Sequence, residues 1–338
     1  MTSFVSRMSE NPEVYRIQIP LKLNSLRNLN VYVIKSCDEA LIIDTGFNTE
    51  ECKEYLLQGL KELKVNISSA SLFLTHSHTD HIGLVDLFSG PDNRIYIGEK
   101  EYEYYKYVSG KKYWDEQKVC YIRDGYPEDS LNQVYEENAI RSFGPDHIFS
   151  PDQLLHDGEE FYLGRIRFKA VEVPGHTPGQ MCLYMPDYRI MFLADHVLFD
   201  ISPNLMVWPF LQNSLQRYLL SLKKILSYDI SMSLPAHREN RNIRLEERVN
   251  QLIIHHRTRL KEVEQIVRDA DPKEGLTAYQ VASMMKWSIH GKKWADAPEK
   301  QKWFSMGEAR AHIQYLLDKD ILELRSRNGI NYYYLKHR

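Results

Sequence analysis

The 338-residue sequence has few cysteines and no long apolar run. Its four cysteines, Cys37, Cys52, Cys120 and Cys182, stand alone and form no C-x-x-C pair, which argues against a disulfide framework and a zinc-thiolate finger. No uninterrupted apolar stretch reaches the roughly 18 residues of a membrane span, so no membrane partner is expected. Residues 1–20 mix charged and polar groups and lack the apolar segment of a secretory signal. We therefore expect a cytoplasmic protein.

Charge is nearly balanced over the chain but unevenly distributed along it. The formal net charge is −3, and hydrophobic residues make up 43% against 26% charged residues, which is typical of a globular chain. Residues 241–338 contain 19 Lys/Arg and 13 Asp/Glu, a net charge of +6, and the remaining residues carry −9. A basic C-terminal part is compatible with nucleic-acid binding, but a solvated face or docking onto an acidic neighbouring domain is favoured because no charge run accompanies it.

The length predicts about two domains. In residues 1–240, short apolar runs alternate with turns and helical patterns, which indicates two sheets covered by helices, an α+β architecture. The predicted strands are Val31–Lys35, Ala40–Asp44, Ser71–Thr75, Arg94–Gly98, Phe161–Leu163, Arg165–Val173, Met181–Met185, Ile190–Ala194 and Ser231–Leu234. The predicted helices are Glu50–Leu63, a segment over Ile82–Phe88, and Ser214–Leu226.

Two segments break this alternation. Residues 99–150 are rich in tyrosine and predict a mostly helical insertion, which either packs over the main body or forms a lid or pocket wall. Residues 241–338 predict three helices, Leu245–Arg268, Ala278–Lys286 and Met306–Asp318, and then a hairpin of Ile321–Arg325 and Asn331–Leu335 turning at Asn328-Gly329. Helices followed by a hairpin predict a winged-helix-like domain, which can bind DNA, dimerise or close a pocket. The added surface favours a homodimer.

A dense cluster of metal-binding side chains follows the predicted strand at Ser71–Thr75. His76 and His78 alternate in an extended segment and can converge on one ion, while Asp80 and His81 come round the next turn toward a second. Metal-binding groups also follow three later predicted strands, namely His176, Asp195 and His237. The site should therefore lie along one edge of the sheets, and its imidazole and carboxylate groups suit zinc, manganese or iron(II).

The series His76-x-His78-x-Asp80-His81, His176, Asp195 and His237 resembles the complete ligand set of the metallo-β-lactamase superfamily, and Asp44-Thr45-Gly46 resembles its early Asp-x-Gly turn. The resemblance covers about Val14–His237 and implies an αββα sandwich with two divalent ions, Zn²⁺ before Mn²⁺ or Fe²⁺. It implies that one ion is held by His76, His78 and His176, that the other is held by Asp80, His81 and His237, and that Asp195 bridges them. Asp80 would also orient the nucleophile or accept a proton. Ala194 and Ala236 replace glycines usual in the family, which we expect to alter loop geometry.

Three motifs further along resemble the tail of the lactamase-beta-2-like branch, which joins a glyoxalase II-like hydrolase to a C-terminal winged-helix domain. They are His255-His256-x-x-Arg259, Thr277-Ala278-Tyr279-Gln280-Val281-Ala282 and Gly307-Glu308-Ala309-Arg310-Ala311-His312. This resemblance implies a catalytic domain over residues 1–240, with the insertion at about 99–150, and a winged-helix-like domain over 241–338.

The leading functional prediction is a dinuclear metal-dependent hydrolase that uses a metal-bridging hydroxide to cleave a small-molecule ester, thioester or lactone. The alternative is a metal-dependent endoribonuclease acting on single-stranded RNA, which the basic C-terminal part would assist. A third hypothesis is a non-catalytic DNA-binding protein, supported only by Lys286, Lys292 and Lys293. The complete ligand set argues against this third hypothesis.

Several other residues are predicted to support the site or the fold without binding metal. Asp44 is expected to hydrogen-bond a ligand histidine, with capping of its own turn as the alternative. His196 should point away from the site and serve the structure. At most one of His255 and His256 can face the site, because adjacent helical residues lie about 100° apart. For Arg259, a salt bridge is favoured over contact with substrate.

Overall fold

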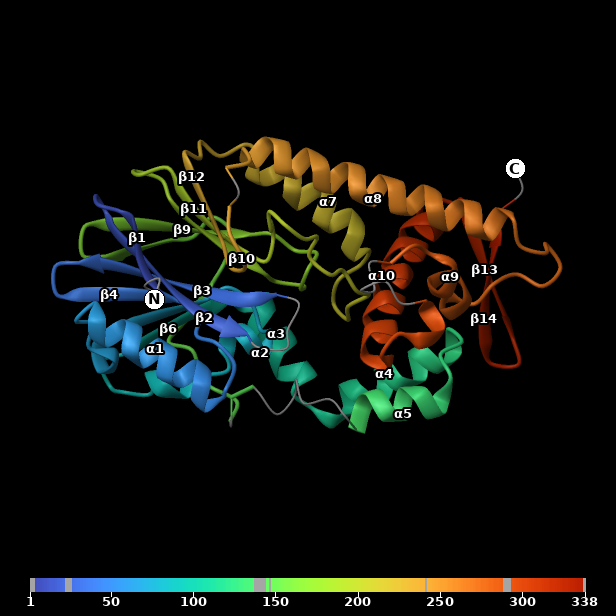
Figure 1. Cartoon of the computed structure of the whole chain (residues 1–338), viewed down its shortest axis with the longest axis horizontal. Helices are drawn as coiled ribbons and strands as arrows, with labels where there is room; N and C mark the ends of the chain where they lie inside the picture. Colours follow the sequence, from blue (N-terminus) through green and yellow to red (C-terminus); the bar gives the residue numbers. More distant parts are fainter. Residues whose placement is uncertain are drawn as a thin grey trace.

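The computed structural model describes residues 4–21, 26–136, 144–145, 147–240, 242–287 and 293–336. Two stacked sheets occupy one end of the molecule, and the C-terminal helices and hairpin occupy the other (Figure 1). No helix within the described ranges is both long and apolar enough to cross a membrane. Of the residues singled out from the sequence, Lys292 lies outside these ranges.

A seven-stranded sheet has the order β1-β2-β3-β4-β5-β6-β7. Neighbours from β1 to β4 pair antiparallel, and those from β4 to β7 pair parallel. The strands span Val5–Ser9, Glu13–Leu21, Arg27–Ser36, Glu39–Ile43, Ser71–Leu74, Arg94–Gly98 and Gln153–Leu155. The four strands predicted in this region are confirmed as β3 to β6. The strands β1, β2 and β7 were not predicted, because charged residues interrupt β1 and β2 and because β7 has only three residues.

The second sheet has five strands in the order β12-β11-β10-β9-β8. In chain order, β8 to β12 span Glu160–Leu163, Ile166–Glu172, Met181–Met185, Ile190–Ala194 and Met232–Pro235, close to the five strands predicted there. A core of aromatic and branched side chains fills the space between the two sheets. In this core the rings of Tyr32 and Phe192 lie 5.2 Å apart, and Phe161 stacks on Phe168 at 5.3 Å.

Helices cover the outer faces of both sheets. Helix α1 (Glu50–Glu62) covers the seven-stranded sheet, while α7 (Ser214–Ile225) and α8 (Leu245–Arg268) cover the five-stranded sheet (Figure 1). The predicted αββα sandwich within an α+β fold is therefore confirmed. The helix predicted over Ile82–Phe88 is wrong in detail, since α2 (Thr79–Ile82) ends at Gly83 and a separate 3-10 turn, η2, covers Val85–Phe88.

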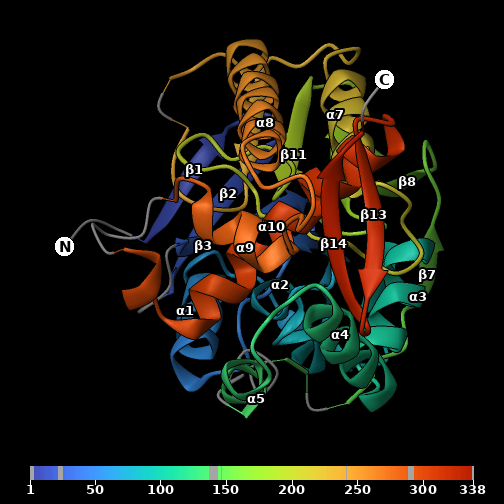
Figure 2. The ribbon, with the colours of Figure 1, turned by 90° about the vertical axis from the view of Figure 1, so that its right-hand side faces the viewer.

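The tyrosine-rich insertion contains the helices α3 (Glu99–Val108), α4 (Lys111–Arg123) and α5 (Glu128–Glu136). Figure 2 shows α4 and α5 below the C-terminal helices and the hairpin. The contact centres on the buried carboxylate of Asp124, which accepts hydrogen bonds from Arg310 Nε at 2.6 Å, Asn331 Nδ2 at 2.9 Å and Tyr333 Oη at 2.9 Å. The insertion thus connects the sheets to the C-terminal part.

The C-terminal part consists of α8, α9 (Ala278–Met284), η3 (Trp294–Asp296), α10 (Glu299–Asp318) and the hairpin β13 (Leu322–Arg327) and β14 (Ile330–Leu335). The predicted bounds of α8 are confirmed, whereas α10 begins earlier than predicted, directly after Pro298. The hairpin turns at Asn328 and Gly329, whose φ angles of 52° and 80° suit this residue pair. One hydrophobic cluster contains residues of the five-stranded sheet, α7 and the C-terminal helices, so the two parts share a core.

Candidate metal centre

The seven predicted ligand residues converge at the edge where the two sheets meet. His76, His78, Asp80 and His81 follow β5, and the other three come after β9, β11 and β12. Apart from the half-buried His78, all of these side chains are buried. They form three overlapping groups that could each hold an ion, namely His76/His78/His176, His76/His81/Asp195 and Asp80/His81/His237.

The first half of the centre is formed by three imidazoles and one carboxylate oxygen. His78 Nδ1 lies 3.1 Å from both His76 Nε2 and His176 Nε2. Asp195 Oδ2 lies 3.5 Å from His176 Nε2 and so completes this half.

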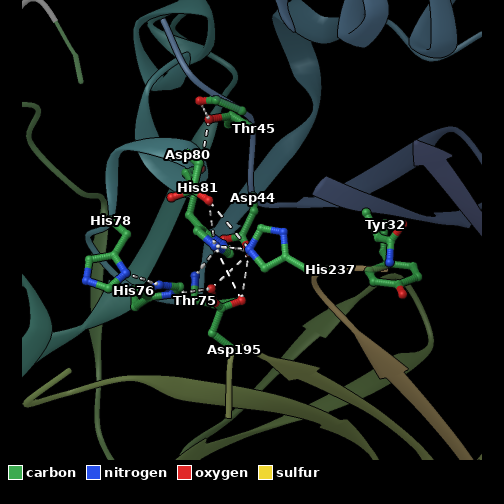
Figure 3. A network of polar contacts seen from close by, with 12 residues as sticks. Tyr32, Asp44, Thr45, Thr75, His76, His78, Asp80, His81, Asp195 and His237 are labelled. Carbon is green, nitrogen blue, oxygen red and sulfur yellow. Dashed lines mark hydrogen bonds and ion pairs between the residues drawn. The ribbon is translucent and has the colours of Figure 1, made fainter. Parts of the chain in front are cut away.

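The second half is formed around the other oxygen of the same aspartate. Asp195 Oδ1 lies 3.1 Å from His237 Nε2 and 3.5 Å from His81 Nε2. Asp80 Oδ2 lies 3.5 Å from His237 Nε2, and the two histidine Nε2 atoms are 3.2 Å apart. Figure 3 shows Asp195 below these groups, with His76 and His78 on one side and His237 on the other.

The donor atoms fit divalent ions in spacing and chemistry. Ligands about 2.0–2.1 Å from a tetrahedral zinc ion are separated from one another by roughly 3.3 Å, which is the separation found within both halves. Asp80 Oδ2 and Asp195 Oδ1 are buried and accept no hydrogen bond. A buried carboxylate oxygen without a hydrogen-bond donor is costly unless a cation pairs with it, so these atoms favour bound metal.

The remaining ring nitrogens of four histidines are fixed by hydrogen bonds. His81 Nδ1 lies 2.8 Å from Asp44 Oδ2, which confirms the role predicted for Asp44. His176 Nδ1 and His237 Nδ1 donate to the backbone carbonyls of Asn204 and Asn28 at 2.8 and 2.7 Å, and His76 Nδ1 contacts Thr75 Oγ1 at 3.0 Å. Such bonds leave the opposite nitrogen free to bind a metal and fix the orientation of the ring. Sequence reasoning missed these carbonyls, because every residue carries one.

Glu101, on α3 of the insertion, ties two ligand loops together and was missed from the sequence. Its Oε1 accepts hydrogen bonds from Ser77 N at 2.8 Å and Ser77 Oγ at 2.6 Å. Its Oε2 accepts from Thr177 Oγ1 at 2.8 Å and Gly179 N at 2.9 Å. Burial raises the pKa of Glu101, and these four donors oppose the rise. Glu101 therefore holds the loops of His76–His81 and His176 in a fixed relation.

The electrostatics of the centre follow from burial and from three carboxylates. Burial lowers the pKa values of His76, His78 and His176, which favours the neutral imidazoles that bind metal. Burial also acts on His81, but Asp44, Asp80 and Asp195 outweigh it and raise the pKa of His81 to about 10. The centre thus has strong negative potential, which attracts cations.

Two backbone positions explain the local shape of the ligand loops. Ala194 has a φ of 49°, in the left-handed region where a Cβ atom costs about 1 kcal/mol. The loop before Asp195 thus keeps the conformation that suits the family's glycine, and alanine bears the strain. A Cβ atom on Gly175 would lie 2.5 Å from Tyr218 Cβ, so only glycine allows the His176 loop to pack on α7.

The other histidines named from the sequence lie outside the centre. His196 is fully buried, and burial lowers its pKa to about 3, consistent with the structural role predicted for it. His256 pairs with His312 at 3.2 Å, which is the core role favoured for it. Arg259 forms the predicted salt bridge, with Glu262 at 2.7 Å, and also lies 3.7 Å from Glu308.

Glu308 gives a pH-dependent prediction for the C-terminal part. Burial raises its pKa from 4.5 to about 7, although Arg259 opposes the shift. The folded protein then retains a proton that the unfolded chain releases, so this contribution to stability is complete below pH 4.5 and is lost as the pH rises toward 7. Relative to Glu308→Gln, the wild type should lose about 1–3 kcal/mol of unfolding free energy between about pH 5 and pH 8 in urea titrations.

The matched control for this prediction is Glu246→Gln, which changes an exposed carboxylate on α8. The difference in unfolding free energy between Glu246→Gln and the wild type should be the same at about pH 5 and about pH 8. A Glu308→Gln variant whose stability follows that of the wild type across this pH range would contradict the assigned shift.

A sequence profile of the metallo-beta-lactamase superfamily matches residues 25–237. This chain therefore belongs to that superfamily, whose members fold as the sandwich described above. Among solved structures, a metallo-beta-lactamase family protein from Thermus thermophilus, TTHA1429, superposes with a TM-score of 0.78 at 22% identity, covering 96% of this chain and 98% of that one.

Three curated relatives are similar in sequence. The probable metallo-hydrolase YqjP of Bacillus subtilis is 25% identical over 324 residues, which are 90% of this chain and 92% of YqjP. The human acyl-coenzyme A thioesterase MBLAC2 is 26% identical over 179 residues, 51% of this chain and 59% of that protein. The atrochrysone carboxyl ACP thioesterase of Emericella nidulans is 26% identical over 229 residues, 67% and 56% of the two chains. The chain spans less than two thirds of the length of either thioesterase.

Proposed function

We propose that the protein is a dinuclear metal-dependent hydrolase that cleaves a thioester. The observation that carries the proposal is the position of Asp195 between the two halves of the centre, with one oxygen facing each half. The superfamily fold and the ligand-like spacing make a hydrolase the best-supported class of enzyme. The thioester class is supported by the two relatives named as thioesterases, one for acyl-coenzyme A and one for an acyl carrier protein.

We further propose that all seven residues bind metal. His76, His78 and His176 would hold one ion, Asp80, His81 and His237 the other, and Asp195 both. Zinc is the expected ion, because tetrahedral sites of histidine and carboxylate suit it. Bound divalent ions lower the pKa of water and polarise a carbonyl oxygen.

Three acidic side chains, Asp80, Asp44 and Glu101, position the groups that react. Asp80 Oδ2 accepts no hydrogen bond and faces His237, so it is placed to orient a water molecule or to accept its proton. The bond between Asp44 and His81 fixes the second half, and Glu101 fixes the loops of the first. Burial of the centre excludes bulk water, which strengthens these electrostatic interactions.

Release of thiol from a panel of acyl-thioesters by the zinc-loaded protein tests this proposal. We expect turnover with at least one acyl-thioester, and a loss of at least about a thousandfold in the matched His76→Ala protein, because one ion loses a ligand. Equal release by the wild type and His76→Ala would exclude the metal centre as the catalyst.

Hydrolysis of single-stranded RNA is the second candidate, and the net charge of +6 in residues 241–338 favours it. If metal is bound but no thioester or lactone is cleaved, RNA cleavage becomes the leading hypothesis. RNA affinity that falls steeply with salt would then support it, because phosphate contacts release counterions.

We also propose that residues 241–338 form a domain of the winged-helix type, as in the lactamase-beta-2-like branch. The order of α8, α9, α10 and the β13–β14 hairpin supports this assignment. The core that these elements share with the five-stranded sheet, and the contacts of α10 with the insertion, favour a pocket-closing role over a free DNA reader.

A further inference from the structure

A series of neighbouring aromatic side chains leads from the metal centre to the protein surface. The ring of His78, the only half-buried residue of the seven, lies 6.3 Å from the ring of Trp208. Trp208 contacts Tyr104 at 5.6 Å. Burial, helped by the neighbouring phenol of Tyr113, raises the pKa of Tyr104, so Tyr113 follows Tyr104 in the series.

The series continues outward through two more rings. Tyr113 contacts Tyr107 at 5.7 Å, and Tyr107 contacts Phe210 at 5.0 Å. We call Trp208, Tyr104, Tyr113, Tyr107 and Phe210 the aromatic track. Burial decreases along it, since Trp208, Tyr104 and Tyr113 are buried, Tyr107 is half-buried and Phe210 is exposed.

Phe210 differs from an ordinary surface residue. Its side chain is 72% exposed, the largest value among the exposed large hydrophobic residues described. Its φ of 65° lies in the left-handed region, which is rare for a bulky side chain and is strained. Such strain persists only where the surroundings hold it, and it is concentrated at functional sites.

The surroundings do hold this loop at both ends. Trp208 Nε1 donates to the backbone carbonyl of Gly175 at 3.3 Å, next to His176. Asn213 caps α7 through Gln216 N at 2.9 Å and donates to Asp318 of α10 at 2.7 Å. A fixed loop therefore presents an exposed aromatic ring at one end of the track, while the other end contacts a residue of the metal centre.

We propose that the accessible outer end of the aromatic track, Tyr107 and Phe210, binds the acyl chain of the thioester. The buried rings of the track connect this end to the metal centre. This inference rests on the function proposed above. It adds that the acyl group is the part of the thioester by which the enzyme distinguishes its substrates. None of the five track residues carries a charge, so the track suits an apolar or aromatic acyl group and not the phosphate-bearing thiol carrier. Flat aromatic side chains offer large contact area to such a group at low entropic cost.

Binding of uncleavable thioethers tests the inference independently of catalysis. The probes are the ethyl and octyl thioethers of N-acetylcysteamine, titrated calorimetrically into the zinc-loaded protein. Each fully buried methylene contributes about fourfold in affinity, so partial burial of the octyl chain should make it at least about tenfold tighter than the ethyl probe.

The test variant is Phe210→Asn, because asparagine tolerates the left-handed conformation and so preserves the loop. It should lower the octyl-to-ethyl ratio at least about fivefold, by loss of apolar contact, and leave the ethyl affinity unchanged. The control is Tyr162→Thr, which removes an exposed aromatic ring from β8 in the five-stranded sheet. This control should keep the wild-type ratio.

The outcomes separate the two proposals. An octyl-to-ethyl ratio that is near one in the wild type, or that is the same in Phe210→Asn and wild type, overturns the acyl-chain site even if thioesters are hydrolysed. A ratio that falls only in Phe210→Asn supports the site. If the zinc-loaded protein released thiol from no acyl-thioester of the panel, the proposed function would be overturned, and the thioether titration would still report on the track.

Discussion

Replacement of Asp195 by asparagine is expected to reduce hydrolysis by at least about a thousandfold and to remove at least one of two bound ions. The amide keeps the shape of the side chain but offers only one acceptor oxygen and no charge. Since each carboxylate oxygen faces a different half of the centre, one half must then face an N–H donor. Thiol release and metal analysis of the same preparation measure the two effects together.

Asp187→Asn is the matched control for this variant. Asp187 lies in the turn between β10 and β11, is exposed, and pairs with Arg167 on the surface. Surface pairs contribute little to stability, so this control should keep both activity and metal content. Wild-type metal content and activity in Asp195→Asn would show that the carboxylate does not serve both halves.

The convergence of the seven residues could be predicted because they are chemically distinctive and follow the ends of strands. That they bind metal stays a prediction. Histidine and aspartate clusters at the ends of apolar strands must meet at one edge of a sandwich, whatever the loops do. The αββα fold could be predicted for the same reason, since the alternation of apolar strands and amphipathic helices allows few arrangements.

The supporting contacts could not be predicted, because they depend on tertiary structure. The backbone carbonyls of Asn28 and Asn204 accept hydrogen bonds from two histidines of the centre, and such carbonyls carry no sequence signal. In the sequence, Glu101 is one of several acidic residues in the first turns of α3. Only the packing of that helix shows that Glu101 is the buried one. The aromatic track through Tyr104 and Tyr107 likewise depends on the position of the loop at Trp208 and Phe210, which the sequence does not reveal.

Replacement of Glu101 by alanine is expected to be the most damaging change outside the seven residues proposed to bind metal. The substitution leaves four buried hydrogen-bond donors without an acceptor. Each unsatisfied donor costs about 1–3 kcal/mol, so the unfolding free energy should fall by about 4 kcal/mol or more. Because Glu101 fixes the loops of Ser77 and Thr177, metal affinity should also fall by about 10–100-fold, as for residues that orient ligands. Urea unfolding and metal titration measure these effects.

Two further variants show whether the hydrogen bonds of Glu101 cause these losses. Glu103→Ala on the same helix removes an exposed carboxylate, so it should leave stability and metal affinity unchanged. Glu101→Gln retains one acceptor oxygen and should recover part of the stability, while its amide donors oppose the N–H groups of Ser77 or Gly179. Partial recovery with persistently weak metal binding would show that the carboxylate positions both ligand loops. Wild-type behaviour of Glu101→Ala would instead mean that packing of α3 alone holds them.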